Sequence, residues 1–362
     1  MHRSFTSFLF LVAILALSLS VVSQPAMAQY SVKTLVSNTP TSTTSHTDPN
    51  LVNAWGLARS AGSAFWVSDN ATGVSTLYNG IGIPQSLIVS IPSADPAVSG
   101  APTGIVFNGS QQFTVQENGG PGSPSIFLFA TLNGTISGWN PTVNLHHAVL
   151  AADNSAAHAV YTGLAISDPT STVQFLYAAD IANNRVDVYD SSFKIVNHLT
   201  DPTIPAGFAP YGIQDINGKV YVTFATNAPT GGFVDVFSEA GILLQRLVRN
   251  SQILNQPWGL ALAPRNFGPF SGALLVGNNT PDGRINAFDV RTGAFLGQLK
   301  DASGKALSID QLWGLSFGGG TPNNGATNEL FFTAGPNEYA NGRFGAIHFT
   351  GRSSIGGGGT QP

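Results

Sequence analysis

The sequence predicts an all-β fold, a six-bladed β-propeller whose last blade is closed by the N-terminal strand. Three observations support this prediction. A glycine-containing segment recurs six times, each copy is followed by two short strand patterns, and no stretch shows the 3.6-residue apolar spacing of a helix. A period of about 40 to 50 residues with several short strands per unit is typical of propeller blades.

The recurring segment is an apolar strand with a glycine near its centre. Successive glycines lie 48, 59, 49, 47 and 55 residues apart. We expect these segments to be the innermost strands, which crowd around one axis, because a position without a side chain lets neighbouring backbones approach. The six segments are NAWGLA with Gly56, PTGIVF with Gly104, YTGLAI with Gly163, PYGIQD with Gly212, PWGLAL with Gly259 and LWGLSF with Gly314.

Each unit continues with a predicted hairpin. An apolar second strand leads into a turn rich in Gly, Asn or Asp, and an alternating third strand follows. The second strands are FWVSD (65–69), IFLFA (126–130), LYAAD (176–180), VYVTF (220–224), LLVGN (274–278) and LFFTA (330–334). The third strands contain GVSTLY, GTISGW, NRVDVYD, GFVDVF, GRINAFD and RFGAIHF.

A fourth, outer strand precedes most of the next glycine segments, as in SLIVSI (86–91). The sixth unit runs from its third strand into GGGGTQP and has no such strand of its own. The stretch YSVKTLV (30–36) alternates as a strand should, so we expect it to complete the sixth blade and remove an open edge.

The first 28 residues resemble an export signal. Arg3 is followed by an apolar run at 8–22 and by the small residues AMA at 26–28. We therefore expect a signal peptide at 1–28, the propeller at 29–350 and a flexible Gly-rich tail at 351–362. This pattern predicts an exported protein, extracellular or periplasmic, without a membrane span in the mature chain, because no later run approaches about 20 apolar residues.

Composition limits the partners. The formal net charge is −4 and only 9% of residues are charged, so the chain offers neither a basic surface for nucleic acid nor a polybasic membrane patch. There is no cysteine, which excludes thiolate metal sites and a cysteine nucleophile. A chain of this length can bury a large core without disulfides, and we expect a monomer.

The motifs PYGIQDINGKVYVTFATN and LYAADIANNRVDVYD resemble NHL-repeat-like six-bladed propellers. The fuller set, with DPNLVNAWGLA, FVDVF, PWGLALAP, LLVGN, GRINAFD and LWGLSFG, resembles a narrower family of exported bacterial propeller proteins of unknown function. Some of its members carry a PEP-CTERM sorting tail, which the sequence after Gly351 lacks. The resemblance implies a fold and a location, and no reaction.

Three polar residues end second strands at equivalent positions in the first, third and fifth units: Asp69, Asp180 and Asn278. In a six-fold ring these units stand about 120° apart, and oxygen ligands that converge on one axis suit Ca²⁺ or another hard cation. The other interpretation is that each side chain hydrogen-bonds the backbone of its own turn.

Two further groups are candidates for a ligand site on the channel face where the inner strands begin. The loop SHTDPNLVNAWG (45–56) supplies His46, Asp48, Asn50 and Asn53, and the interpretation as an ordinary Pro-containing turn stays open. Asn255, before Pro257, is in the same situation. Aromatic residues at matching positions, Trp55, Tyr211, Trp258 and Trp313, either bind a planar ligand such as a sugar ring or pack between blades as core.

Two functions from different classes fit the sequence. The first is a non-catalytic binding or scaffold module that presents the loop-lined channel face to a protein, glycan or small ligand. The alternative is a metal-dependent, Ca-type hydrolase of the lactonase or gluconolactonase kind, in which a cation polarises an ester carbonyl. Enzymes of that class place acidic or amide ligands where this chain has Trp55, Thr103, Thr162, Tyr211, Trp258 and Trp313. This departure favours the binding module.

Overall fold

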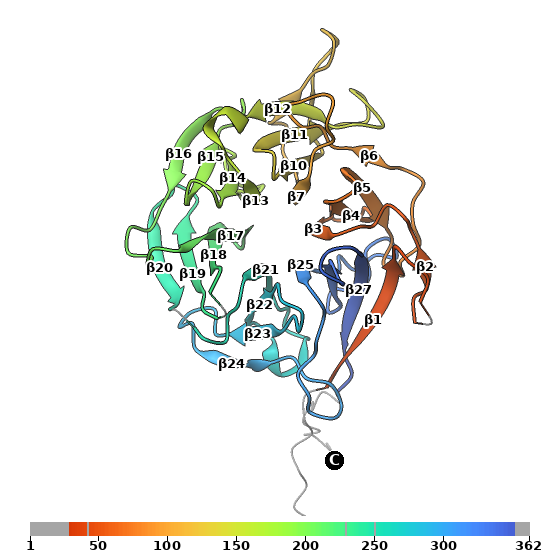
Figure 1. Cartoon of the computed structure of the whole chain (residues 1–362), viewed down its shortest axis with the longest axis vertical. Helices are drawn as coiled ribbons and strands as arrows, with labels where there is room; N and C mark the ends of the chain where they lie inside the picture. The colour runs from red at the N-terminus through yellow and green to blue at the C-terminus, as the bar shows by residue number, and fades with distance from the viewer. Residues whose placement is uncertain (1–28, 42, 229, 250, 352–362) are drawn as a thin grey trace, which may run out of the picture.

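The computed structural model describes residues 29–351, apart from positions 42, 229 and 250. The expected signal peptide (1–28) lies outside the described residues, as does the expected tail apart from Gly351. Six antiparallel sheets surround a central axis, so the predicted all-β six-bladed propeller is confirmed (Figure 1). No helix in the described part of the chain is long and apolar enough to cross a membrane.

In each blade the strands follow chain order from the axis outward. Blade 1 contains β3 (Ala54–Ala58), β4 (Phe65–Asp69), β5 (Val74–Tyr78) and β6 (Val89–Ser90). Blade 2 contains β7 (Pro102–Phe107), β10 (Phe127–Thr131), β11 (Thr135–Trp139) and β12 (Val149–Asp153). Blade 3 contains β13 (Tyr161–Ile166), β14 (Leu176–Asp180), β15 (Arg185–Tyr189) and β16 (Ile195–Leu199).

Blade 4 contains β17 (Phe208–Asp215), β18 (Lys219–Thr226), β19 (Phe233–Ser238) and β20 (Leu243–Val248). Blade 5 contains β21 (Pro257–Leu262), β22 (Leu274–Asn278), β23 (Ile285–Phe288) and β24 (Phe295–Gln298). Blade 6 contains β25 (Leu312–Phe317), β26 (Leu330–Ala334) and β27 (Arg343–Phe349). A small hairpin, β8 (Thr114–Val115) and β9 (Ser123–Pro124), and two short 3-10 turns, η1 (Ser155–Ala157) and η2 (Gly268–Phe270), complete the elements.

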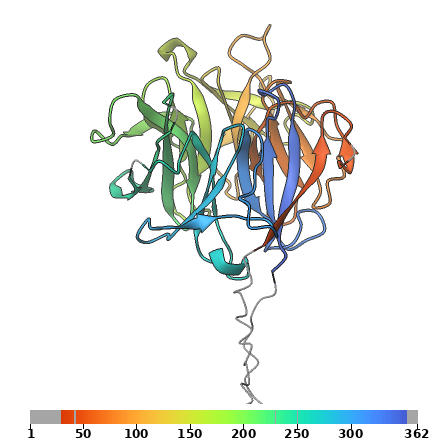
Figure 2. The ribbon, with the colours of Figure 1, turned by 60° about the horizontal axis from the view of Figure 1, so that its bottom comes forward.

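The N-terminal strand closes the ring. Strand β1 (Tyr30–Ser37) pairs antiparallel with β27, from Tyr30 opposite Phe349 to Ser37 opposite Arg343, and so supplies the fourth strand of blade 6. The short strand β2 (His46–Thr47) then adds to the outer side of β1 in parallel. Figure 2 shows the red-orange N-terminal strand beside the blue C-terminal one. The predicted closure is confirmed.

The inner-strand glycines are the points of closest approach between blades. A methyl group on Gly212 would lie 2.0 Å from the carbonyl oxygen of Trp258 in the next blade, and one on Gly56 would lie 2.3 Å from that of Thr103. Equivalent contacts join Gly104 to blade 3 and Gly259 to blade 6. Because backbone occupies this space, a side chain at these positions would separate the blades.

Hydrogen bonds from side chains cross every one of the six blade interfaces. In each case a threonine hydroxyl or asparagine amide donates to a carbonyl oxygen at the start of the next inner strand, which satisfies a backbone acceptor that strand pairing leaves open. The six bonds are Asn70 to Pro102, Thr103 to Tyr161, Thr162 to Tyr211, Thr223 to Pro257, Asn279 to Leu312 and Thr333 to Trp55.

The substitution Gly212→Ala tests the glycine contacts. We expect it to destabilise the protein by about 3 kcal/mol or more, because the added methyl group meets backbone that cannot move alone. The control is Gly62→Ala, since a methyl group there has nothing within 4 Å and we expect a change within about 0.5 kcal/mol. Urea unfolding measures both, and equal stability of the two variants would contradict the packing role.

The closing strand depends on Tyr30, which is 1% exposed, donates its hydroxyl to the carbonyl of Phe267 at 2.8 Å and packs on the rings of Phe267, Phe270 and Phe349. We expect Tyr30→Ala to lower the free energy of unfolding by about 3 to 5 kcal/mol. Tyr30→Phe, which loses only the hydrogen bond, should cost about 1 kcal/mol. A small effect of the alanine variant in the same unfolding assay would show that β1 is not needed for closure.

Candidate functional site

The central channel has two different ends. One end, which we call the plugged end, is where the inner strands begin and the hairpin turns between second and third strands lie. The other end is where the inner strands finish, and it holds an open cavity. Between them the channel narrows to a void of about 30 Å³, lined in part by Gly56, Gly104 and Gly314 and bounded by Trp258.

Three indoles fill the plugged end. Trp55 and Trp313 stack with ring centroids 3.6 Å apart, and Trp258 meets both edge-on at 6.1 and 5.6 Å. The three side chains are 6%, 1% and 9% exposed, and Tyr211, Tyr339 and Leu132 pack around them. The indoles therefore serve as core of the channel mouth, and the structure presents no open aromatic platform there.

The backbone before each indole is left-handed. Asn53, Gln256 and Gln311 have φ values of 49°, 46° and 53°, and each stands two residues before its tryptophan. The carbonyl of each accepts a backbone N–H from the hairpin turn of the same blade, at 2.9 to 3.2 Å. These bonds offset the strain of a left-handed non-glycine residue and turn the chain so that the indole reaches the axis.

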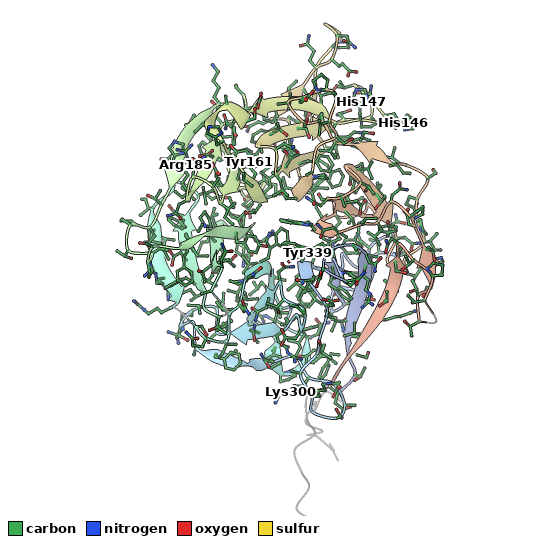
Figure 3. The ribbon with its side chains drawn as sticks, in the orientation of Figure 1. His146, His147, Tyr161, Arg185, Lys300 and Tyr339 are labelled. Atoms are coloured by element: carbon green, nitrogen blue, oxygen red, sulfur yellow. The ribbon has the colours of Figure 1, made fainter. Side chains whose placement is uncertain are left out.

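Tyr339 also belongs to the plug, and the sequence did not single it out. Asn337, Glu338 and Tyr339 form a turn of three consecutive left-handed residues, with φ of 59°, 53° and 68°. This turn directs the Tyr339 ring to 5.8 Å from Trp313, and its hydroxyl donates to Asn279 Oδ1 at 2.9 Å. Figure 3 shows Tyr339 at the centre of the ring. The one available signal was an aromatic residue within a hairpin turn.

The structure separates the four residues of the predicted loop site. His46 lies in β2, at the outer edge of blade 6, far from the axis in strand order. Asp48 is 9% exposed and binds Asn50 through its own turn, from the backbone N–H at 2.9 Å and from Nδ2 at 3.0 Å. Asn53 alone reaches the plug, where its Oδ1 accepts from Trp313 Nε1 at 3.1 Å.

Asn255, the remaining loop candidate, forms a backbone bridge with Gly231 of the neighbouring blade. It is half-buried, and this bridge holds the segment that leads into β21. The prediction of a ligand site on these loops therefore stays a prediction, and nothing in the geometry gathers its residues.

The three predicted metal ligands each bind within their own blade. Asp180 accepts from Val160 N at 3.0 Å and from Asn183 N and Nδ2 at 3.2 and 2.7 Å. Asn278 donates to the carbonyl of Ile253 at 2.9 Å. Their partners are Asn183 in the hairpin turn of blade 3 and the segments that lead into β13 and β21. No group of three or more His, Cys, Asp or Glu residues suited to a metal occurs in the described part of the chain, and the calcium site remains a prediction.

Asp69 has a different environment, because it lies in a buried chain of oxygens. Thr76 Oγ1 is 2.7 Å from Asp69 Oδ2 and 2.8 Å from the Tyr78 hydroxyl, which is 2.9 Å from Asp48 Oδ2. Three oxygen–oxygen contacts need three hydrogens, and the two hydroxyl groups supply only two. One carboxyl group therefore carries a proton.

The proton belongs to Asp69. Asp48 Oδ1 already accepts two N–H groups, whereas Asp69 Oδ1 is buried and has no hydrogen-bond partner among the described residues. Burial raises the pKa of Asp69 well above its usual range, in agreement with this assignment. A protonated Asp69 donates along the chain to Thr76, then Tyr78, then the Asp48 carboxylate, and it makes a poor ligand for a cation.

The substitution Asp69→Asn tests whether the Asp69 carboxyl group carries a proton or binds a cation. A raised native pKa means that the native state binds more protons than the unfolded state, so this group lowers stability as pH rises above about 4. We expect the difference in unfolding free energy between the asparagine variant and wild type to grow in favour of the variant from pH 4 to pH 7.

Asp180→Asn is the matched control, because its carboxylate accepts three N–H groups, and we expect it to lose about 1.5 to 3 kcal/mol. Thermal unfolding with calcium and with chelator completes the test. A calcium-dependent stabilisation of wild type that Asp69→Asn abolishes would contradict the proton assignment.

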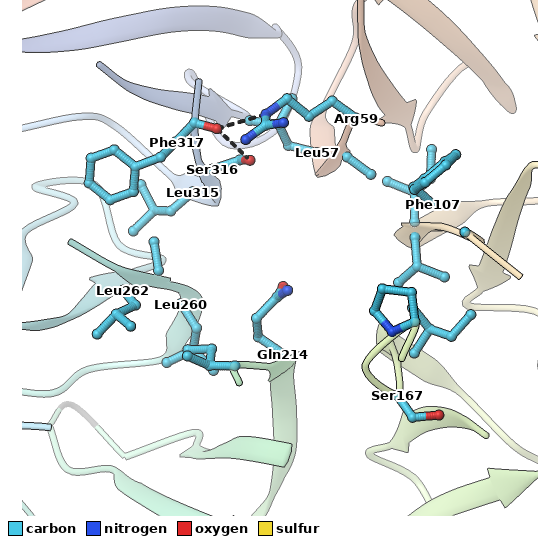
Figure 4. Close-up of a pocket in the computed structure, with 18 of the residues that line it drawn as sticks. Leu57, Arg59, Phe107, Ser167, Gln214, Leu260, Leu262, Leu315, Ser316 and Phe317 are labelled. Carbon is cyan, nitrogen blue, oxygen red and sulfur yellow. Dashed lines mark hydrogen bonds between the residues drawn. The ribbon is translucent and has the colours of Figure 1, made fainter. Parts of the chain in front are cut away.

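The cavity at the other end has a volume of about 380 Å³. Each blade contributes at least one aliphatic side chain from its inner strand or just beyond it, and Figure 4 shows Leu57, Leu260 and Leu315 among them. Taken in blade order, they include Leu57, Ile105, Ile166, Ile216, Leu260 and Leu315. The polar side chains of the described lining are Arg59, Ser167, Gln174, Gln214 and Ser316.

Arg59 is the one charged residue of this described lining. Its Nε donates to the Phe317 carbonyl at 2.8 Å, Nη2 to Gly318 at 3.0 Å and Nη1 to Ser60 at 3.2 Å. Burial lowers the pKa of Arg59, and no carboxylate of the described residues forms an ion pair with it. Sequence reasoning missed this residue, although it follows WGLA directly, where the other copies of the segment lack a cation.

Comparison with known proteins places the chain among viral relatives. It is 33% identical over 341 residues to uncharacterized protein R648 of Acanthamoeba polyphaga mimivirus, covering 89% of this chain and 81% of that protein. The chain belongs to the same family. Uncharacterized protein L690 of the same virus is 31% identical, with 89% and 86% covered. No family model matches the chain, so the resemblance to NHL repeats and to PEP-CTERM proteins stays a prediction.

Three solved structures are similar to this chain in fold. A streptogramin B lyase aligns with a TM-score of 0.52 at 11% identity, covering 91% of this chain and all of that one. A catalytically inactive virginiamycin B lyase from Staphylococcus aureus gives 0.51 at 12%, with 89% and 100% covered. A gluconolactonase from Xanthomonas campestris gives 0.50 at 14%, with 83% and 87% covered. At these identities the likeness shows the fold alone.

Proposed function

We propose that this family member is an exported, non-catalytic binding module that holds a small ligand in the cavity at the open end of its channel. The cavity carries the proposal. Its volume of about 380 Å³ and its lining of mainly apolar residues with a few polar side chains match the usual character of small-molecule sites. Export is supported by the pattern of Arg3, the apolar run at 8–22 and the AMA stretch.

The packing of the plugged end also favours a ligand site in the cavity at the opposite end. Ligand sites on the face where inner strands begin need room at the axis, and three indoles occupy that room with at most 9% of any side chain exposed. A small molecule therefore has access from the cavity end, where the aliphatic ends of the inner strands stand apart.

The alternative, a metal-dependent lactonase-like hydrolase, requires carboxylates that hold the cation and activate water. The described lining of the cavity contains one guanidinium and otherwise neutral side chains. At the plugged end, Asp180 and Asn278 each bind a hairpin turn or the segment that leads into the inner strand of their own blade. These contacts favour a binding module over a hydrolase.

Blocking the cavity tests the proposal. Gln214 projects into the cavity in Figure 4 and is exposed, so Gln214→Trp should fill the space without disturbing the core. Gln85→Trp, on an exposed loop of blade 1, is the matched control. Small molecules that co-purify with wild type are extracted, identified by mass spectrometry and added back to each protein during thermal unfolding.

We expect the extracted compound to stabilise wild type and Gln85→Trp by about 2.7 kcal/mol at a hundredfold excess over its dissociation constant, and Gln214→Trp not at all. If no extracted compound stabilises wild type, or if Gln214→Trp responds as wild type does, the cavity is not the binding site.

A further inference from the structure

The position of Arg59 points to the chemistry of the ligand. Its guanidinium stands at the junction of blades 6 and 1, on the wall of the cavity, close to Leu57 and Phe317 (Figure 4). Three of its N–H groups donate to backbone carbonyls. A guanidinium has five N–H groups, so one on each terminal nitrogen remains. A guanidinium that offers one N–H on each terminal nitrogen can bind a carboxylate through both of them.

The Arg59 charge is half-buried and forms no ion pair with a carboxylate of the described residues. The three acceptors are neutral carbonyl oxygens, and the nearby lining is aliphatic or amide. Removing a cation from water without an anion beside it costs free energy. Holding the Phe317–Gly318 backbone in place needs only hydrogen-bond donors, which a neutral side chain also supplies. A ligand that brings a negative charge would offset that cost.

A second group of the wall lacks a partner. The Gln174 side chain is 1% exposed and its Nε2 donates to the carbonyls of Asp168 and Ser171 at 2.9 and 2.8 Å, which fixes the orientation of the amide. Its Oε1 is buried and accepts no hydrogen bond from the described residues. Buried polar atoms are nearly always paired, but this oxygen has no accessible surface, so a ligand in the open cavity does not reach it and Arg59 alone is assigned the polar contact.

We propose that the cavity binds a small amphipathic carboxylate, with its acid group on the two free N–H groups of Arg59 and its apolar body against the aliphatic ring of the channel. The inference rests on the proposed function, because it assigns a ligand class to the same cavity.

The experiment compares octanoate with octan-1-ol, which has the same chain and no charge. Isothermal titration at pH 7 measures the dissociation constant of each for the full chain. We expect octanoate to bind at least about tenfold more tightly, because a charge-assisted hydrogen bond contributes about 1.5 to 3 kcal/mol. Arg59→Gln should weaken octanoate by about tenfold or more and leave octan-1-ol unchanged.

Two further variants test whether Arg59 acts through its charge or only by holding the Phe317 segment. Arg59→Lys keeps the charge, so it should retain a preference for octanoate over octan-1-ol. Arg291→Gln, on an exposed turn of blade 5, should bind both compounds as wild type does. The thermal unfolding of each variant shows whether the Phe317 segment is still held.

The outcomes are distinct. Equal binding of octanoate and octan-1-ol, blocked by Gln214→Trp, would overturn the acid preference and leave the cavity as a binding site. Octanoate affinity that Arg59→Gln does not change would overturn the role of Arg59. Failure of octanoate to bind wild type would overturn the ligand class, whereas the extraction experiment above decides the binding function independently.

Discussion

The structure depends on the contact between each inner-strand glycine and the backbone of the next blade. At Gly212 and Gly56 the space for a side chain is already taken by a neighbouring carbonyl oxygen. The blades therefore approach until backbone meets backbone, and the hydrogen bonds from Thr103, Thr162 and their equivalents can cross the interfaces. Because the channel narrows to a void of about 30 Å³ between its ends, a ligand can bind only at one of the two ends.

The two ends have opposite characters because different side chains lie at the start and at the finish of the inner strands. At the start of the strands, left-handed residues before Trp55, Trp258 and Trp313 turn large side chains onto the axis, and the strained turn at Tyr339 adds a fourth ring. At the finish, short aliphatic side chains leave a cavity whose wall carries Arg59. The plug completes the core of the ring, and the cavity is the binding surface that we propose.

Much of the architecture could be predicted from the sequence, because it is repeated. The predicted second strands at 65–69, 176–180, 274–278 and 330–334 coincide with β4, β14, β22 and β26. The contacts of the candidate site residues could not be predicted in the same way. Equivalent positions say where Asp69 and Asp180 lie in their blades, but not that one joins a buried oxygen chain and the other a turn. The position of Arg59 on the cavity wall depends on the contact between blades 1 and 6, where it donates to Phe317 and Gly318, and the sequence does not show this contact.

The most direct test of this account is the exchange of the indole N–H hydrogens in heavy water, followed by nitrogen-15 NMR. A plugged channel predicts that the signals of Trp55, Trp258 and Trp313 persist as long as those of inner-strand amides, because the indoles are buried and two of them donate hydrogen bonds, to Thr162 and Asn53. Loss of these three signals in the first spectrum, with strand amides still protected, would show that water reaches the axis and would contradict it.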